Sequence, residues 1–354
     1  MKPEQNPPGV ASMPPATIIP RALRRGLALM ATIAGLAILS TPTGAQERPA
    51  AAPWPTRPVT LIVPYAAGGN VDVMARWIAP ELARRLGQPV VIENISGAGG
   101  VIGTQKAVRA TADGHTLLLS VESAILIAKM VTPATVPYDG QQDLAPVTLL
   151  GSQPLALAGK PALSHLTAGE LHADLQAHPG QYSYATTGVG TSLHLAGELL
   201  KQSGQIDMVH APYRMGTQVL TDLAGNQIEL AVLPLSMLIE QARAGKLQVF
   251  GVLDDKPSPA MPEVAPLGAT VPAWQGANAR VWTGVFAPRG TPAERIERLD
   301  AALQDILTLE DVRQNFAATG VDPEGLGPAA FSAYLAEQAK TYEGIITRGH
   351  IRAE

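Results

Sequence analysis

Residues 59–72 read VTLIVPYAAGGNVD and decide the fold class of this 354-residue chain. An apolar, β-branched run at residues 59–65 leads into a loop of small residues, and residues 71–86 follow with helical spacing. The alternation continues through another strand, helix and strand, expected at residues 89–93, 103–109 and 116–120. This β-α-β-α-β order predicts an α/β protein whose parallel sheet carries helices on its faces.

A second α/β unit begins near residue 181. Its expected strands and helices alternate in the same way, at residues 182–186, 192–202, 208–213, 217–223 and 228–233. Apolar runs at 147–150 and 155–158 suit a strand that passes from one unit to the other. A later strand at 281–287, a helix at 293–307 and a last helix at 329–346 are expected to return to the first unit. Two crossings between the units would form a hinge.

The first 53 residues differ from the rest. A basic patch (Arg21, Arg24 and Arg25) precedes an uncharged apolar run at 26–39 and small residues at 43–45. This order is typical of a secretory signal peptide, because the apolar run is too short for an ordinary membrane span. We expect a cleaved signal peptide at residues 1–45 and a flexible mature N-terminus at 46–56. An uncleaved N-terminal anchor is the alternative.

Composition narrows the class of partner. The formal net charge of −4 gives no overall basic field, so nothing recruits nucleic acid. The chain has no cysteine, so the exported protein has no disulfide and cannot be a lipoprotein. After the leader, no segment is long and apolar enough to span a membrane, and we expect a mature protein that is not membrane-inserted.

Glycine-rich loops follow two of the first three expected strands. In the loop at 66–69, small side chains would let a ligand approach the main chain, and the free N–H groups of the next helix favour an anion. Asp72 would act there as a cap or helix-start acid rather than as a catalyst. The loop at 96–100 follows the same logic, with a simple tight turn as the alternative.

A third such loop, residues 186–192, enters the helix that carries His194 and Glu198. Hydroxyl groups and backbone donors at a helix N-terminus can hold a carboxylate without a buried cation. Thr191 and Ser192 are the best candidates for this role. Helix capping alone is the alternative, and the two roles are compatible.

Signatures of catalysis and of cofactors are missing from the sequence. The first strand is not followed by Gly-x-Gly-x-x-Gly, and the chain has neither a Gly-Lys-Ser/Thr loop nor a Gly-x-Ser-x-Gly elbow. The seven histidines show no metal-binding spacing. We therefore expect no catalytic residue, no metal and no cofactor.

The glycine loops and their flanks resemble the tripartite tricarboxylate transporter receptor family, also called Bug or TctC proteins. Segments that carry the resemblance occur in order along the mature chain, at residues 57–72, 86–103, 113–118, 137–139, 191–198, 209–213 and 287–292. The resemblance implies a periplasmic protein with a type II periplasmic-binding-protein fold, in which two doubly wound lobes are joined by a hinge. Lobe 1 would comprise residues 57–153 plus 277–354, and lobe 2 residues 154–276.

The family likeness also implies a ligand and its contacts. The cleft between the lobes would take a small carboxylic acid, an amino acid or a related amide, and the protein would be a monomer. In the family, backbone groups and bridging waters near the Ala-Gly-Gly loop hold the carboxylate. Carried over to this chain, the ligand-binding residues of lobe 1 are Tyr65, Ala66, Ala67, Gly68 and Asp72. Those of lobe 2 are Thr187, Thr191 and Ser192.

Two departures from the family pattern concern specificity. Ser120 and Glu122 follow the third strand, where relatives carry small or hydroxyl residues, and residues 233–235 are apolar where relatives are often polar. If Glu122 faces the cleft, it would repel a di- or tricarboxylate and suit a cationic or amide group. If Glu122 pairs with an arginine such as Arg280, its role is structural. Both readings remain open, and Ser120 and Glu122 join the candidate ligand contacts.

The function expected from the sequence is capture of a small carboxylate by hinge closure, followed by delivery to the permease subunits of a tripartite tricarboxylate-type transporter. One alternative is an exported enzyme that acts on a carboxylic acid through Glu122 and His194. Another is a sensor that presents its closed form to a signalling partner.

Overall fold

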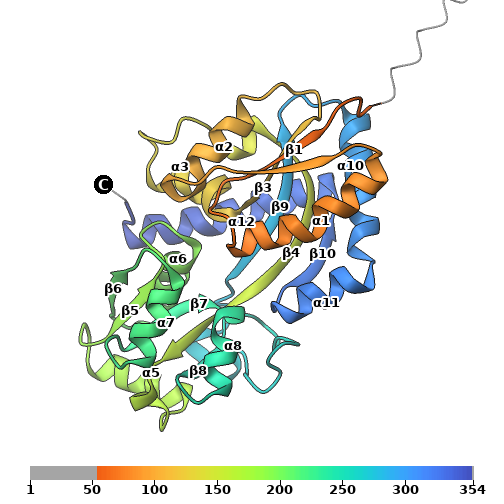
Figure 1. Cartoon of the computed structure of the whole chain (residues 1–354). Coiled ribbons are helices and arrows are strands. Elements are labelled where there is room, and N and C mark those ends of the chain that lie inside the picture. The colour runs from red at the N-terminus through yellow and green to blue at the C-terminus, as the bar shows by residue number, and fades with distance from the viewer. Residues whose placement is uncertain (1–53, 353–354) are drawn as a thin grey trace, which may run out of the picture. The chain divides into compact units, whose positions relative to one another are not determined.

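The computed structural model describes residues 54–352 (Figure 1). The expected signal peptide, residues 1–45, lies outside the described residues. Every element discussed below belongs to the unit that begins at Pro53.

Strands β1, β2 and β3 are parallel to one another, and β9 joins them by pairing antiparallel with β3. Their bounds are β1 (Val59–Val63), β2 (Val90–Asn94), β3 (Thr116–Val121) and β9 (Arg280–Pro288). The helices of this part are α1 (Asn70–Leu86), α2 (Val101–Val108), α10 (Ala293–Leu307), α11 (Glu310–Ala318) and α12 (Pro328–Gly349). Each of the strands and helices predicted here from the sequence is present, within a few residues of its expected bounds.

The second group of strands lies on the other side of β4 (Leu144–Gly159). It contains β5 (Ser183–Thr186), β6 (Val209–Pro212), β7 (Leu230–Pro234) and β8 (Gln248–Val252). Its helices are α5 (Ala168–Ala177), α6 (Ser192–Gly204), α7 (Gly216–Ala224) and α8 (Leu235–Arg243). The strand order through both groups is β2-β1-β3-β9-β4-β7-β5-β6, with β8 and β10 (Asp322–Leu326) also paired to β4.

Strand β4 is the element that both groups share. Its residues from Leu144 to Pro154 pair antiparallel with β9, and its residues from Leu155 to Gly159 pair antiparallel with β7. In Figure 1, β4 accordingly runs from the first group of strands into the second. The sequence analysis expected this passing strand, and the α/β fold class is confirmed. The numerical lobe limits given above stay a prediction.

Short elements complete the chain. They are η2 (Ala98–Gly100), η3 (Ser123–Ile127), α3 (Ala128–Val131), α4 (Gly140–Asp143), η4 (Pro161–Leu163), α9 (Leu267–Thr270) and η5 (Pro272–Trp274). Of these, η3 is a π-helical turn that begins directly after Glu122. Sequence reasoning assigned no element there, and π-helical turns are frequent at functional sites.

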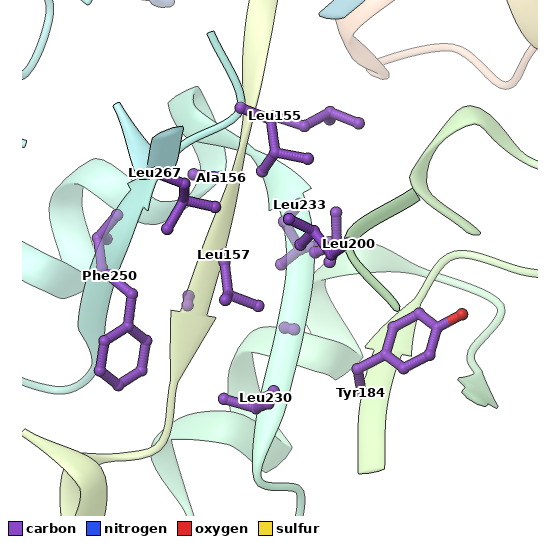
Figure 2. Packing of buried hydrophobic residues seen from close by; sticks show 14 of the residues in the cluster. Leu155, Ala156, Leu157, Tyr184, Leu200, Leu230, Leu233, Phe250 and Leu267 are labelled. Atoms are coloured by element: carbon purple, nitrogen blue, oxygen red, sulfur yellow. The ribbon is translucent and has the colours of Figure 1, made fainter. Parts of the chain in front are cut away.

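Apolar side chains of β4 lie at the centre of the second core. Leu155 and Leu157 are fully buried and pack with residues of β5, β7 and β8 (Figure 2). The labelled neighbours in that view are Ala156, Tyr184, Leu200, Leu230, Leu233, Phe250 and Leu267. Truncating one such buried leucine to alanine typically costs about 2–5 kcal/mol. The strand shared by both groups is thus also anchored by packing.

Helix α12 packs more widely than the sequence suggested. It contacts β4, but it also contacts α6 of the second group, where the side chain of Gln202 donates to the carbonyl of Ile345 at 3.2 Å. The last helix therefore ties the two groups of strands together, whereas the sequence analysis expected it to pack back on the first unit and named no contact with the second.

A close approach of α6 to β5 yields a stability prediction. A Cβ at Gly197 would lie 2.1 Å from Cε2 of the buried Tyr184, so Gly197→Ala should destabilise the protein by about 1–3 kcal/mol. Gly169 of α5 has open space around it, and Gly169→Ala should be neutral or stabilising by up to about 1 kcal/mol. Urea denaturation of both variants measures the difference. Equal stabilities would contradict this packing.

Candidate functional site

The loop between β1 and α1 is exposed and is held by one buried acid. Asp72 accepts a hydrogen bond from the backbone N–H of Gly68 at 2.8 Å, and others from the side chains of Arg76 at 2.8 Å and Asn94 at 3.0 Å. The hydrogen bond from Arg76 is the main reason why the pKa of Asp72 lies below its ordinary value. With these three donors in place, the buried Asp72 carboxylate fixes the loop and has little left to offer a ligand.

The start of α1 leaves backbone donors free. Gly69 is the N-cap residue and has no side chain to cap the helix, so the first N–H groups of α1 lack a side-chain partner. Ala66, Ala67 and Gly68 are exposed beside them, and Gly68 has a φ of +83°, a conformation that favours glycine. The loop can therefore present main-chain donors to an anion, as the sequence predicted. That a ligand binds there stays a prediction.

Tyr65 and Ser120 lie deeper in the first group of strands. Burial raises the pKa of the Tyr65 phenol, and the nearby Ser120 hydroxyl opposes that shift. A Cβ at Gly100 would lie 2.9 Å from the Tyr65 hydroxyl oxygen, so this ring reaches toward η2. Among the residues described, neither hydroxyl has a hydrogen-bond partner.

Glu122 is buried at the junction of β3 and η3. One carboxylate oxygen accepts from the backbone N–H of Trp282 at 3.0 Å, and the other has no partner within residues 54–352. Burial raises the pKa of Glu122 to about 7. Arg280 pairs instead with Asp254 and Asp322. The hypothesis that Glu122 pairs with Arg280 is therefore wrong.

The loop between β5 and α6 brings lobe-2 candidates toward Glu122. The Thr191 hydroxyl accepts from the backbone N–H of His194 at 3.3 Å and donates to the carbonyl of Gly188 at 2.9 Å, so Thr191 caps α6. The backbone N–H of Ser192 donates to the Ser123 hydroxyl at 3.4 Å. The Ser192 hydroxyl lies near the Glu122 carboxyl, whose pKa it lowers. Thr187 is half-buried in the same loop.

Two stacked imidazoles support this loop. The rings of His194 and His210 lie 3.9 Å apart between centroids and 17° from parallel. His194 Nδ1 accepts from the backbone N–H of Gly190 at 3.2 Å, and His210 Nε2 lies 2.7 Å from the Thr186 hydroxyl. Burial, the main cause, lowers the pKa of each histidine to about 4, and Lys201 lowers both further. Glu198 opposes the shift only at His210.

The second glycine loop is a tight turn. Gly97, Gly99 and Gly100 all have positive φ, and a Cβ at Gly103 would lie 2.7 Å from both the Ile95 carbonyl oxygen and Pro64. These close contacts place the start of α2 against β1. The structure thus agrees with the tight-turn alternative for residues 96–100.

A cavity of about 230 Å³ lies between residues of the two groups of strands. Its polar lining side chains are those of Asn70, Gln153, Ser236, Thr283 and Thr319. The remaining lining residues are apolar, and none of the side chains that line it is charged. None of the ten predicted contacts lines this cavity, but Val71 and Val121, which neighbour Asp72, Ser120 and Glu122 in sequence, do.

Sequence reasoning missed the cavity residues for a simple reason. Gln153, Ser236 and Thr283 come from β4, the start of α8 and β9, where no glycine loop marks the strand ends. The available signal was the polar Gln153 inside a run that otherwise reads as a buried strand.

The metal and enzyme hypotheses concern specific groups of side chains. Within residues 54–352, no group of three or more His, Asp or Glu side chains is arranged to hold a metal ion. Glu122 and His194, the pair required by the enzyme hypothesis, have separate partners, Trp282 and Gly190. No hydrogen bond or ion pair joins the two in the part of the chain that the structure describes.

Comparison with known proteins places the chain in a family. Residues 74–350 match the model of the tripartite tricarboxylate transporter family receptor, TctC. The chain belongs to this receptor family. Protein BugT of Bordetella pertussis is 35% identical over 298 residues, which make up 83% of this chain and 89% of BugT. The resemblance drawn from the glycine loops is confirmed.

Solved structures agree with the assignment. MatC of Rhodopseudomonas palustris, solved with bound malate, is similar with a TM-score of 0.71 and 29% identity, covering 83% of this chain and 100% of MatC. A second R. palustris protein, solved with adipate, has a TM-score of 0.75 and 26% identity, covering 84% of this chain and 99% of that one. The periplasmic-binding-protein fold expected from the sequence is confirmed.

Receptors of this family are periplasmic solute-binding proteins. From residue 54 to residue 352, no helix has the length and apolar character needed to cross a membrane.

The buried Glu122 gives a prediction that depends on pH. Its pKa in the folded protein is about 7, against an ordinary 4.5, so its contribution to stability is lost as the pH rises from about 4.5 through 7. Glu122→Gln should therefore be more stable than the parent protein at pH 8, by up to about 3 kcal/mol, and of similar stability at pH 5. Urea denaturation at both pH values tests this. A variant that is less stable at pH 8 would refute it.

The histidine pair gives a prediction in which stability is lost as the pH falls rather than as it rises. Each folded-state pKa is near 4, below the ordinary 6.5, so stability is lost as the pH falls from about 6.5 toward 4. His194→Asn keeps an acceptor for Gly190 but does not titrate, and it should reduce the loss between pH 7 and pH 5 by up to about 2 kcal/mol. Thermal unfolding of the variant and of the parent protein at pH 7 and pH 5 measures this loss of stability. An equal loss in the two proteins would argue against the role assigned to the histidines.

Proposed function

We propose that this protein captures a small carboxylate in the cavity between the two groups of strands and delivers it to the permease of a tripartite tricarboxylate-type transporter. The observation that carries the proposal is the uncharged cavity, which lies beside the free N–H groups at the start of α1. Malate and adipate in two similar proteins support a carboxylate as the ligand class. The family name describes a receptor and one similar solved structure, BugD, is named a periplasmic binding protein, and we propose no catalytic role.

The head group of the ligand would bind to main-chain donors. Asn70 and Val71 line the cavity and are the first two residues of α1, where unpaired N–H groups and the helix dipole favour an anion. The exposed loop of Ala66, Ala67 and Gly68 adds further backbone next to them. Recognition of this kind holds a carboxylate without a lysine or arginine.

Closure would complete the site from the other side. Ser192 begins α6 of the second group, and its hydroxyl is buried and has no hydrogen-bond partner among the described residues. It lies near Glu122, which belongs to the first group. The two groups are linked through β4, and bending of β4 and of the segment that leads into β9 would move one group against the other. A ligand that touches both sides stabilises the closed form, which the permease would recognise.

A ligand screen with one matched pair of variants tests the proposal. Thermal-shift measurements across organic acids, amino acids and their amides should identify at least one stabilising carboxylate, and calorimetry should then give its affinity. Ser192→Ala should weaken that affinity about 10- to 100-fold, because a hydrogen bond to a charged group is lost. Because the Ser192 hydroxyl also lies near the Glu122 carboxyl, urea denaturation of the variant should accompany the binding measurement.

Ser203→Ala is the control for this variant. Ser203 lies on the same helix, and its hydroxyl donates only to the carbonyl of Leu199, at 2.7 Å. This variant should bind like the parent protein. A flat response to every acid would contradict carboxylate binding, and full affinity in Ser192→Ala would remove Ser192 from the site.

A further inference from the structure

The walls of the cavity indicate which part of a ligand they would contact. Apolar surface comes from Met74 and Trp77 of α1, Val121 of β3, Met237 of α8 and Val281 of β9. Such surface favours hydrocarbon or aromatic groups over charged ones, because a buried charge without a partner is costly.

Two polar atoms in the wall lack partners. Gln153 is only 6% exposed, and its side-chain carbonyl oxygen makes no hydrogen bond to any described residue. The hydroxyl of Ser236, at the start of α8, is also buried and unpaired there. An unsatisfied buried group of this kind costs about 1–3 kcal/mol, and a ligand that supplied the missing hydrogen bond would recover part of that cost. Both groups are neutral.

Two arginines that are next to lining residues in sequence are already paired. Arg76, in the second turn of α1, holds the buried Asp72, and Arg280, at the start of β9, holds Asp254 and Asp322. None of the side chains lining the cavity is Lys, Arg or His. Two buried acids neighbour lining residues in sequence. Asp72, between Val71 and Val73, already accepts three hydrogen bonds, whereas Glu122, which follows Val121, has one unpaired carboxylate oxygen. A second carboxylate on a ligand would therefore meet no cation among the side chains that line the cavity.

We infer that the cavity selects a monocarboxylate whose body is largely apolar and carries one or two neutral hydrogen-bonding groups, such as a hydroxyl or an amide. The inference rests on the proposed function and narrows its ligand class. The cavity of about 230 Å³ corresponds to the volume of about eight water molecules, so the body is small. Malate and adipate, the ligands of two similar proteins, each carry a second carboxylate and would be disfavoured here.

Ligands that differ only at the far end test this selectivity. Hexanoate, 6-hydroxyhexanoate and adipate share a six-carbon chain, and the expected order of affinity is hydroxy acid, then hexanoate, with adipate at least about tenfold weaker than hexanoate. If another acid gives the largest thermal shift in the screen, the same three end groups are compared on its skeleton.

Each outcome of this comparison has a meaning. A di- or tricarboxylate as the tightest ligand overturns the inference and leaves the proposed function standing. A flat response to all acids overturns both.

Variants locate the selectivity in this cavity. Gln153→Leu is close to isosteric and should weaken the hydroxy acid about tenfold while leaving hexanoate almost unchanged. Gln105→Leu, on α2 and outside the cavity lining, is the matched control and should change neither affinity. If Gln153→Leu does not fold, Ser236→Ala serves the same comparison. Equal losses of affinity for both acids, or no loss of affinity in Gln153→Leu and Ser236→Ala, would refute the assignment.

Trp77 provides a direct signal of occupancy. It lines the cavity, whereas Trp54, Trp274 and Trp282 are buried in the cores. Binding should change the tryptophan emission, and Trp77→Phe should abolish that change while calorimetry still detects binding. A full emission change in Trp77→Phe would place the ligand elsewhere.

Discussion

The hydrogen bonding of one strand, β4, is the constraint on which the rest of the structure depends. Within 16 residues it pairs first with β9 and β10, through its N-terminal part, and then with β7 and β8, through its C-terminal part. Because Gln153 lies where β4 changes partners, the strand that joins the two halves also supplies a wall of the cavity. Motion about the join and the shape of the cavity are therefore coupled through the same backbone.

Charge is arranged so that the cavity stays neutral. The buried carboxylate of Asp72 uses its hydrogen bonds to hold the first loop, and Arg280 is shared between Asp254 and Asp322. Structural ion pairs of this sort remove cations that could otherwise hold an acidic ligand. Under the proposed function, specificity would then depend on neutral donors and on apolar surface.

The fold could be predicted well from sequence, and the site only in part. Alternating apolar runs and helical spacing predicted β1 to β3 and β5 to β7, because local periodicity determines such elements. The glycine loops predicted the backbone at the start of α1 and the cap at Thr191. The cavity could not be predicted, because Gln153, Ser236 and Thr283 are distant in sequence and meet only through strand register. The role of Asp72 likewise depended on Asn94 and on the backbone of Gly68, which no sequence pattern pairs with it, although Arg76 stands at the helical i, i+4 spacing.

The stacked histidines have a consequence for the speed and strength of recognition. Gly190 near the end of the β5–α6 loop and Thr186 at its beginning are each tied to an imidazole, and Thr191 closes the loop onto α6. A segment restrained at both ends has already lost most of its conformational entropy before any solute arrives. In the proposed closure, an encounter with a solute would require rotation of preformed surfaces rather than the ordering of a chain, and no affinity would be spent on that ordering.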